Sequence, residues 1–182
     1  MILALETSCD DTCAAVVTRA GQIRANVISS QGVHDRYGGV VPEIASRHHL
    51  ELVNTVVDDA LARAGASLDD VELVAVTQGP GLVGALLVGV ATAKGLAAAR
   101  RLPLAPVDHL QGHVAATYLE PEPMRPPFLC LLASGGHTLL ARVTAISSAS
   151  SSVAPAVCSA SLTTALTSSR WWREATSGTT PP

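Results

Sequence analysis

The chain has 182 residues, of which 48% are hydrophobic, 15% charged and only 3% aromatic, and its formal net charge is −3. This composition excludes disorder throughout, because disorder needs low hydrophobicity and high net charge. It also disfavours a nucleic-acid binder that works through a broad basic surface. The length suffices for one domain with a core of Ala, Val and Leu, and is short for two.

Cysteine usage and the first residues predict a cytoplasmic protein. The four cysteines show no Cys-x-x-Cys spacing, and the N-terminus lacks the basic region of a signal peptide. The apolar stretch Leu82–Ala99 is long enough to cross a membrane. Its glycines, its threonine and Lys94 argue against a span, so we expect no membrane association.

The pattern of apolar residues predicts alternating strands and helices. Three closely spaced apolar runs come first and suggest an antiparallel meander: Ile2–Glu6, Cys13–Thr18 and Ile23–Ser29. The expected elements that follow are a helix over Glu43–Ala64 closed by Gly65, a strand over Val71–Thr77, a helix over Leu82–Arg101, a strand over Leu104–Val107, a helix over His109–Leu119, and strands over Phe128–Ala133 and His137–Val143. The second helix is apolar nearly all round, so we expect it to be buried. This order predicts an α/β fold with a mixed sheet and helices on its faces.

Three turns follow predicted strands, where α/β sheets place their ligands. Thr7–Thr12 has short hydroxyl and carboxylate side chains that could hold a phosphate or a metal-bound water. Gln78–Gly84 places glycines before a helix N-terminus, which attracts anions. Leu132–Thr138 has a pair of glycines whose backbone N–H groups could accept an anion. Each turn also fits an ordinary role, as a hairpin or as tight packing of a helix on a sheet.

Two histidines give the sharpest local signal. His109 and His113 are four residues apart, on one face of the predicted helix, where they could share one metal ion. A zinc protease of the His-Glu-x-x-His type is disfavoured, because Leu110 stands where that motif needs Glu. A structural role for the pair stays open, since two ligands alone are insufficient and a third is needed from elsewhere. His48 and His49 are adjacent, face different ways and are not expected as ligands.

Together these segments resemble the TsaD family, the bacterial tRNA N6-adenosine threonylcarbamoyltransferases. The matching motifs occur in the family's order: Glu6–Thr12, Val41–His49, Gln78–Leu82, His109–His113 and Ala133–Thr138. The resemblance covers residues 1–143 almost continuously. It implies the fold of the actin, hexokinase and acetate-kinase superfamily, in which two RNase-H-like lobes enclose a ligand cleft. It also implies transfer of the threonylcarbamoyl group from threonylcarbamoyl-adenylate to N6 of adenosine 37 in tRNAs that read ANN codons.

The resemblance further implies a set of site residues and partners. His109 and His113 would bind one divalent metal per subunit, iron or alternatively zinc. The residues that would line the adenylate site are Leu132, Ala133, Ser134, Gly135 and Gly136. The turn that would face the cleft supplies three possible catalytic residues, Ser8, Asp10 and Asp11. The implied partners are a TsaB-like paralogue, a TsaE-like ATPase and tRNA.

The last 39 residues, 144–182, differ in character from the rest. They contain 17 Ser or Thr and three charged residues, and they show no strand or helix period. The family's second lobe, with its metal-binding Asp, is missing here, so we expect a truncated and impaired form. A frameshift would explain this tail, because Thr179–Pro182 read one base earlier can encode Asp-Asp-Ala-Ala. A genuine low-complexity tail is the alternative.

Two other functions remain. One is a non-catalytic, TsaB-like interaction module, which by resemblance lacks the histidine pair. The other is a metallopeptidase, as the family's older name of O-sialoglycoprotein endopeptidase or glycoprotease suggests. His109 and His113 favour the transferase lineage over the first, and Leu110 argues against the second.

Overall fold

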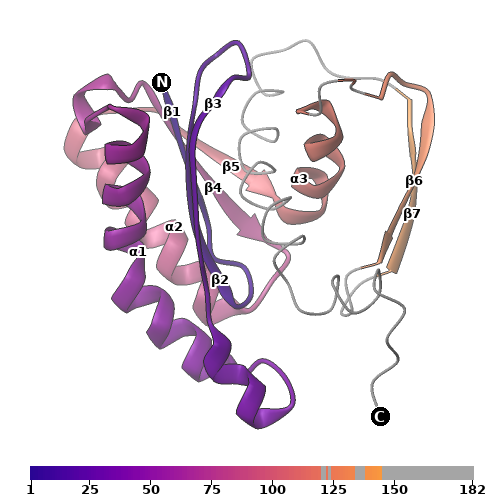
Figure 1. Cartoon of the computed structure of the whole chain (residues 1–182), viewed down its shortest axis with the longest axis horizontal. Coiled ribbons are helices and arrows are strands. Elements are labelled where there is room, and N and C mark those ends of the chain that lie inside the picture. The colour runs from indigo at the N-terminus through magenta and orange to yellow at the C-terminus, as the bar shows by residue number, and fades with distance from the viewer. Residues whose placement is uncertain (120–121, 123, 134–137, 145–182) are drawn as a thin grey trace.

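The computed structural model describes residues 1–119, 122, 124–133 and 138–144, and these form one α/β lobe followed by a separate hairpin (Figure 1). The strands are β1 (Ile2–Glu6), β2 (Asp11–Val17), β3 (Ile23–Ser30), β4 (Leu73–Gly79), β5 (Leu104–Asp108), β6 (Phe128–Ala133) and β7 (Thr138–Val143). The α-helices are α1 (Pro42–Ala64), α2 (Val83–Arg100) and α3 (His109–Ala115), and the short 3-10 helices are η1 (Gly32–Tyr37), η2 (Leu68–Asp70) and η3 (Ala116–Tyr118). The predicted order of strands and helices is confirmed. The boundaries move by only a few residues, except that the last predicted helix ends at Ala115 and continues as η3.

The main sheet has five strands in the order β3-β2-β1-β4-β5. The first three strands pair antiparallel, as the meander predicts, with Ile2 opposite Val17 and Asp11 opposite Ser30. β4 then joins the other edge of β1 in parallel, and β5 joins β4 in parallel. The sheet is therefore mixed, and the helical connections place α1 and α2 side by side on one of its faces (Figure 1).

The two long helices begin and end at identifiable signals. Pro42 occupies the first turn of α1, where its missing N–H removes nothing that the helix needs. Gly65 closes α1 with φ +64°, and its N–H donates to the Ala62 carbonyl. α2 ends at Arg100, and the next residue, Arg101, takes the same left-handed conformation with φ 54°.

The core is aliphatic, in agreement with the composition. The larger apolar cluster joins alternate residues of the strands, such as Leu3 and Leu5, to the inward face of α1, such as Val53 and Val57. The strand residues that alternate with these point to the other face of the sheet. They form a smaller cluster of Ile2, Ala4, Ala15, Val17, Ala75 and Val107. β1 is consequently buried along its whole length.

The expectation that α2 is buried all round is wrong. Its buried residues are all small: Ala85, Gly89, Ala93 and Ala97. Val83 and Leu87 are 83% and 65% exposed on the outer side. The reason is the close approach of α2 to the sheet and to α1, which allows full burial of small side chains, while Val88, Val90 and Leu96 are only partly buried against the core. Among the described residues α2 is also the one helix long and apolar enough to cross a membrane, yet in this fold it packs against β4 and α1.

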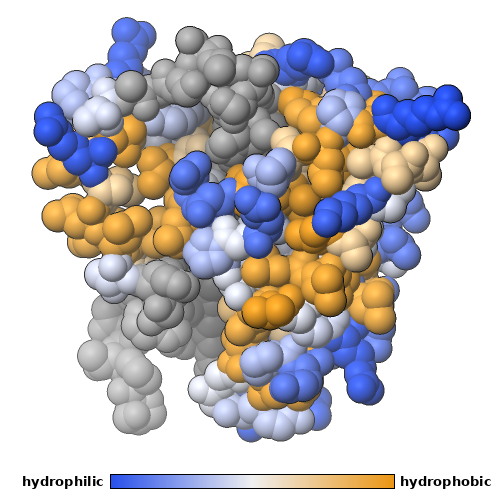
Figure 2. Space-filling view, turned by 180° about the vertical axis from the view of Figure 1, so that it is seen from behind, coloured by the Kyte–Doolittle hydropathy of each residue, from blue (hydrophilic) through white to orange (hydrophobic). Residues whose placement is uncertain are grey.

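β6 and β7 form a two-stranded sheet apart from the main sheet, on the far side of α3 (Figure 1). Leu129, Leu131 and Leu140 share one face of this hairpin, and each is about two-thirds exposed, at 67%, 69% and 66%. Figure 2, the view from behind, shows apolar side chains gathered over the hairpin as well as over the outer helix face. The other face includes Leu132, which is buried.

Candidate metal centre

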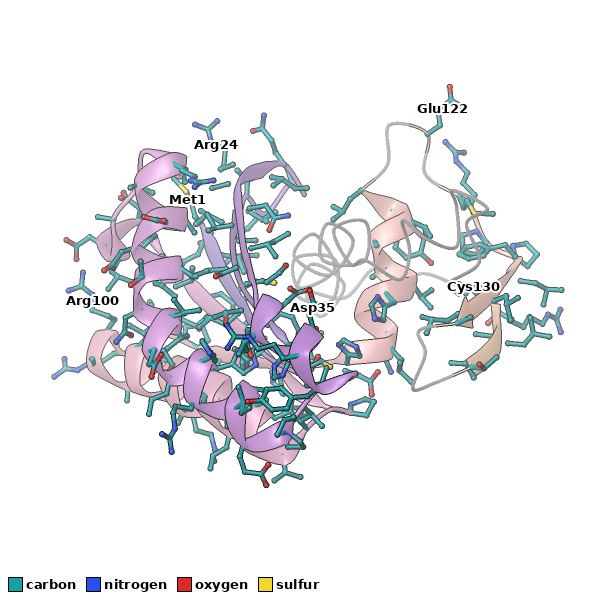
Figure 3. The ribbon with its side chains drawn as sticks, turned by 60° about the horizontal axis from the view of Figure 1, so that its bottom comes forward. Met1, Arg24, Asp35, Arg100, Glu122 and Cys130 are labelled. Carbon is teal, nitrogen blue, oxygen red and sulfur yellow. The ribbon has the colours of Figure 1, made fainter. Side chains whose placement is uncertain are left out.

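The polar residues of the lobe gather where β1, β4 and β5 end. These three parallel strands finish at Glu6, Gly79 and Asp108, and α/β sheets bind ligands at this edge. In Figure 3 the end of the molecule that carries η1, with Asp35 labelled, comes forward. α3 lies beside it, between the sheet and the hairpin that carries Cys130. The first residue of α3 thus follows directly from a strand end.

The histidine pair has the geometry of two ligands for one metal ion. Asp108 caps α3 by accepting a hydrogen bond from the Gln111 N–H at 2.9 Å, which fixes where the helix begins. The Nε2 atoms of His109 and His113 then lie 3.2 Å apart, with ring centroids 4.5 Å apart. Two imidazoles bound to one metal at about 2.1 Å place their nitrogens about 3.0–3.4 Å apart. The predicted facing of the two rings is confirmed.

The other nitrogen of His109 is held from the end of β1. Its Nδ1 lies 3.0 Å from Ser8 Oγ and 3.4 Å from Glu6 Oε2. Glu6 is only 2% exposed, and its Oε1 accepts the Ser8 N–H at 2.5 Å. Burial opposes ionisation of Glu6 and by itself would raise its pKa. The hydrogen bond and the charge of His109, together with hydrogen bonds from Ser8 and Thr77, outweigh burial and lower the pKa of Glu6. An ionised carboxylate accepts only, so Nδ1 of His109 carries a proton, and in the neutral ring the lone pair is then on Nε2.

His113 completes the pair as a neutral imidazole. Burial, and then the charge of His109, lower its pKa to about 4. Its Nδ1 is buried with no hydrogen-bond partner among the described residues. A neutral ring whose Nε2 faces a second imidazole fits a metal ligand. Within the described part of the chain no third His, Cys, Asp or Glu joins these two in a ligand group. The residues present therefore fit two positions of a metal shell.

The polar turn between β1 and β2 contributes unequally to this centre. Ser8, 3% exposed, touches His109 directly. Asp11 points instead toward Ser30 on the neighbouring strand. Burial and the charges of Asp10 and Glu6 raise the pKa of Asp11 to about 6, although its hydrogen bond with Ser30 works in the opposite direction. Of the three possible catalytic residues, the structure brings Ser8 alone into contact with the histidine pair.

The glycines at the start of α2 serve close packing. A Cβ at Gly81 would lie 2.6 Å from the Ser8 carbonyl oxygen, and one at Gly84 or Gly89 would overlap the hydroxyl of Ser46 or Thr7. Thr7 in turn donates a hydrogen bond to the Ala85 carbonyl at 2.8 Å. These contacts explain the glycines without an anion.

The predicted adenylate site lies mostly outside the described residues. Leu132 and Ala133 are the last two residues of β6. Ser134, Gly135 and Gly136 fall in the undescribed stretch 134–137, so these assignments stay predictions.

Two buried polar residues near the centre were not assigned from the sequence. Glu6 orients His109, and the one available signal was a carboxylate closing an otherwise apolar run. His49, fully buried, contacts the β1–β2 turn through the Cys9 carbonyl at 3.0 Å. Its expected absence from the ligand set agrees with this contact, because both of its ring nitrogens are engaged.

The main sheet consists of an antiparallel meander followed by two parallel strands, with helices in the connections. This arrangement defines an RNase-H-like lobe of the actin and hexokinase type. A solved structure described as YeaZ from Pseudomonas aeruginosa shares this fold, with a TM-score of 0.54 and 22% identity. The similarity covers 78% of this chain and 64% of that one.

Sequence comparison then gives the family. Residues 22–166 match the family described as TsaD: tRNA N6-adenosine threonylcarbamoyltransferase. Proteins of that name from Clostridium perfringens and Clostridium beijerinckii are 52% and 53% identical over 144 residues, 79% of this chain. The chain belongs to the TsaD family. It spans 42% of the length of these relatives.

Proposed function

We propose that this chain supplies the metal-binding lobe for transfer of a threonylcarbamoyl group from threonylcarbamoyl-adenylate to N6 of adenosine 37 in tRNAs that read ANN codons. The observation that carries the proposal is the pair of facing Nε2 atoms of His109 and His113, 3.2 Å apart, in a chain of the TsaD family. The relatives carry the name of this transferase activity.

The reaction needs positioning and charge stabilisation more than a protein nucleophile, because the mixed anhydride is already an activated acyl donor. A divalent metal, iron or alternatively zinc, would supply Lewis-acid polarisation of the carbonyl at this centre. The chain's own task is to hold His109 and His113 with their Nε2 lone pairs forward. Glu6 and Ser8 perform it by fixing the proton on Nδ1 of His109.

The remaining site assignments belong to the same proposal. We assign the leaving AMP to the segment from Leu132 to Gly136, whose glycine N–H groups suit a phosphate. We place Asp10 and Asp11 at the cleft wall, near but not on the metal. The third ligand, an Asp by resemblance, would come from the portion of the relatives' length that this chain does not span. By itself the chain would then be impaired in transfer.

Partners follow from the same family. We propose that the lobe works with a TsaB-like paralogue, a TsaE-like ATPase and tRNA, in the cytoplasm. Support for a paralogue comes from the shared fold of the YeaZ structure. The net charge of −3 supports a need for help in holding tRNA.

A non-catalytic, TsaB-like module is the second candidate, and the YeaZ similarity favours it. The histidine pair favours the transferase instead, since an interaction module needs no two imidazoles turned toward each other at a strand end.

The test is a double variant, His109→Ala with His113→Ala, compared with His48→Ala on α1. Metal content of the anaerobically purified chain and cobalt binding in solution are measured. Threonylcarbamoyl transfer to tRNA is assayed with the partner subunits present. We expect the double variant to lose metal and any transfer, while His48→Ala keeps both. Metal content or transfer retained in the double variant would overturn the proposal.

A further inference from the structure

The β1–β2 turn is held by three different segments of the chain. The carbonyl of Ser8 accepts a hydrogen bond from the Leu82 N–H at 2.8 Å, and that of Asp10 accepts one from the Gln31 N–H at 3.1 Å. Between them, the carbonyl of Cys9 lies 3.0 Å from Nε2 of His49. Three consecutive carbonyls are thus fixed, and only the middle one depends on a side chain.

A buried chain of hydrogen bonds sets the proton positions that this contact needs. The Val41 N–H, which can only donate, reaches Nδ1 of His34 at 3.3 Å, so His34 carries its proton on Nε2. That N–H donates to Oε1 of Gln31 at 3.0 Å. The Gln31 amide nitrogen then donates to the Ala45 carbonyl at 3.3 Å and faces Nδ1 of His49 at 3.4 Å.

The last link fixes His49. The Thr12 hydroxyl lies 2.8 Å from Nδ1 of His49, on the same nitrogen that Gln31 faces. Nδ1 is therefore an acceptor, and the proton sits on Nε2, where it is donated to Cys9. His49 and Thr12 are completely buried, and burial lowers the pKa of His49, so the ring stays neutral.

We propose that His49 is a positioning residue for the metal centre, acting through the Cys9 carbonyl to keep the Ser8 hydroxyl on Nδ1 of His109. Ser8 and Cys9 are adjacent, and the Ser8–His109 distance is 3.0 Å. A displacement of the turn by about 1 Å would take this contact beyond hydrogen-bonding range. The functional meaning of the role rests on the proposed metal centre, whereas the proton positions do not.

The decisive variants are His49→Asn and His49→Gln, which differ by one methylene group. The Gln side chain can carry its amide to the position of Nε2 and donate to Cys9, whereas Asn is too short. Val57→Ala, a core truncation in the same helix, is the control for general destabilisation. The readouts are long-range ¹H–¹⁵N spectra of the histidine rings at constant pH, and the dissociation constant for Co²⁺ of the folded chain.

In the unsubstituted chain we expect His49 to be protonated on Nε2 and His109 on Nδ1. His49→Asn should shift the ¹⁵N resonance of His109 Nδ1, which keeps Glu6 as a partner but loses Ser8, and should weaken Co²⁺ binding about tenfold. His49→Gln and Val57→Ala should preserve both. A purely structural role would lower stability in His49→Asn and Val57→Ala alike, leaving the His109 ring and Co²⁺ affinity unchanged.

Each remaining outcome also decides. Unchanged His109 signals in folded His49→Asn would overturn the proposal. An Nδ1 proton on His49 in the unsubstituted chain would also overturn it, and this measurement needs no variant to fold. Absence of Co²⁺ binding to the unsubstituted chain would refute the metal centre of the proposed function. The ring spectra would then still decide whether His49 positions the turn.

Discussion

Two glycines of α2, Gly89 and Gly95, should respond in opposite directions to the same substitution by alanine. Gly89 is buried against Thr7, and a Cβ there would overlap Oγ1 of that threonine. Gly95 has nothing within 4 Å of the position that a Cβ would take. Both are interior to the helix, where alanine is favoured over glycine by about 1 kcal/mol.

The magnitude at Gly89 follows from what Thr7 must give up. Thr7 is completely buried and donates to the Ala85 carbonyl at 2.8 Å. Turning its hydroxyl away leaves a buried polar group without a partner, at about 1–3 kcal/mol, and the overpacking adds a comparable term. After the gain in helix propensity, Gly89→Ala should lower the free energy of unfolding by about 1–5 kcal/mol. Gly95→Ala should raise it by up to about 1 kcal/mol.

Urea unfolding followed by far-ultraviolet circular dichroism measures the difference. The two variants should be separated by at least about 1 kcal/mol, which is at least about 2–4 °C in Tm for a chain of this size. The reasoning would be refuted if Gly89→Ala were as stable as the unsubstituted chain. It would equally be refuted if Gly95→Ala were destabilised, because α2 would then not pack as described.

Three further positions can be tested by substitution: Asp11 and Asp108 near the candidate metal centre, and Gly65 at the end of α1. Burial raises the pKa of Asp11 to about 6, so ionisation of this group makes the fold less stable as pH rises from about 4 to 6. Asp11→Asn should remove this dependence of stability on pH and should be more stable at pH 7 by about 1–3 kcal/mol in urea titrations. The same pH dependence in both proteins would contradict the burial of Asp11. Asp108→Ala should lower stability by about 1 kcal/mol through loss of the α3 cap, and should weaken Co²⁺ binding. Asp108→Asn keeps an acceptor and should do neither. Equal behaviour of the two variants would show that the Asp108 side chain does not cap α3. Gly65→Ala, at φ +64°, should cost about 1 kcal/mol in thermal unfolding despite the open space around it, and an unchanged Tm would argue against the left-handed end of α1.

Local patterns predicted the elements well because each rests on neighbouring residues. The meander, the period of α1 and the Gly65 stop are readable in this way, and the i, i+4 spacing correctly brought His109 and His113 together. The exposure of α2 was not predictable, because hydropathy does not show that the fully buried positions of this helix accept only small side chains.

The orienting groups of the site depend on contacts between distant parts of the chain. Glu6 meets His109 across 103 positions, and His49 meets Cys9 across 40. A glutamate at the end of an apolar run and a histidine in a helical period look like surface residues until the strands and helices are assembled. The turn residues Asp10 and Asp11 show the converse, since adjacency in sequence to Ser8 did not place them on the histidines.

The hairpin of β6 and β7 has a consequence for handling the chain by itself. A two-stranded ribbon with free edges among the described strands and with Leu129, Leu131 and Leu140 on one face is a template for strand pairing between molecules. Precipitation of the purified chain should therefore begin at the hairpin and not at the lobe. Leu131→Lys should raise the soluble concentration while Co²⁺ binding stays unchanged, which separates the colloidal behaviour of the protein from its chemistry.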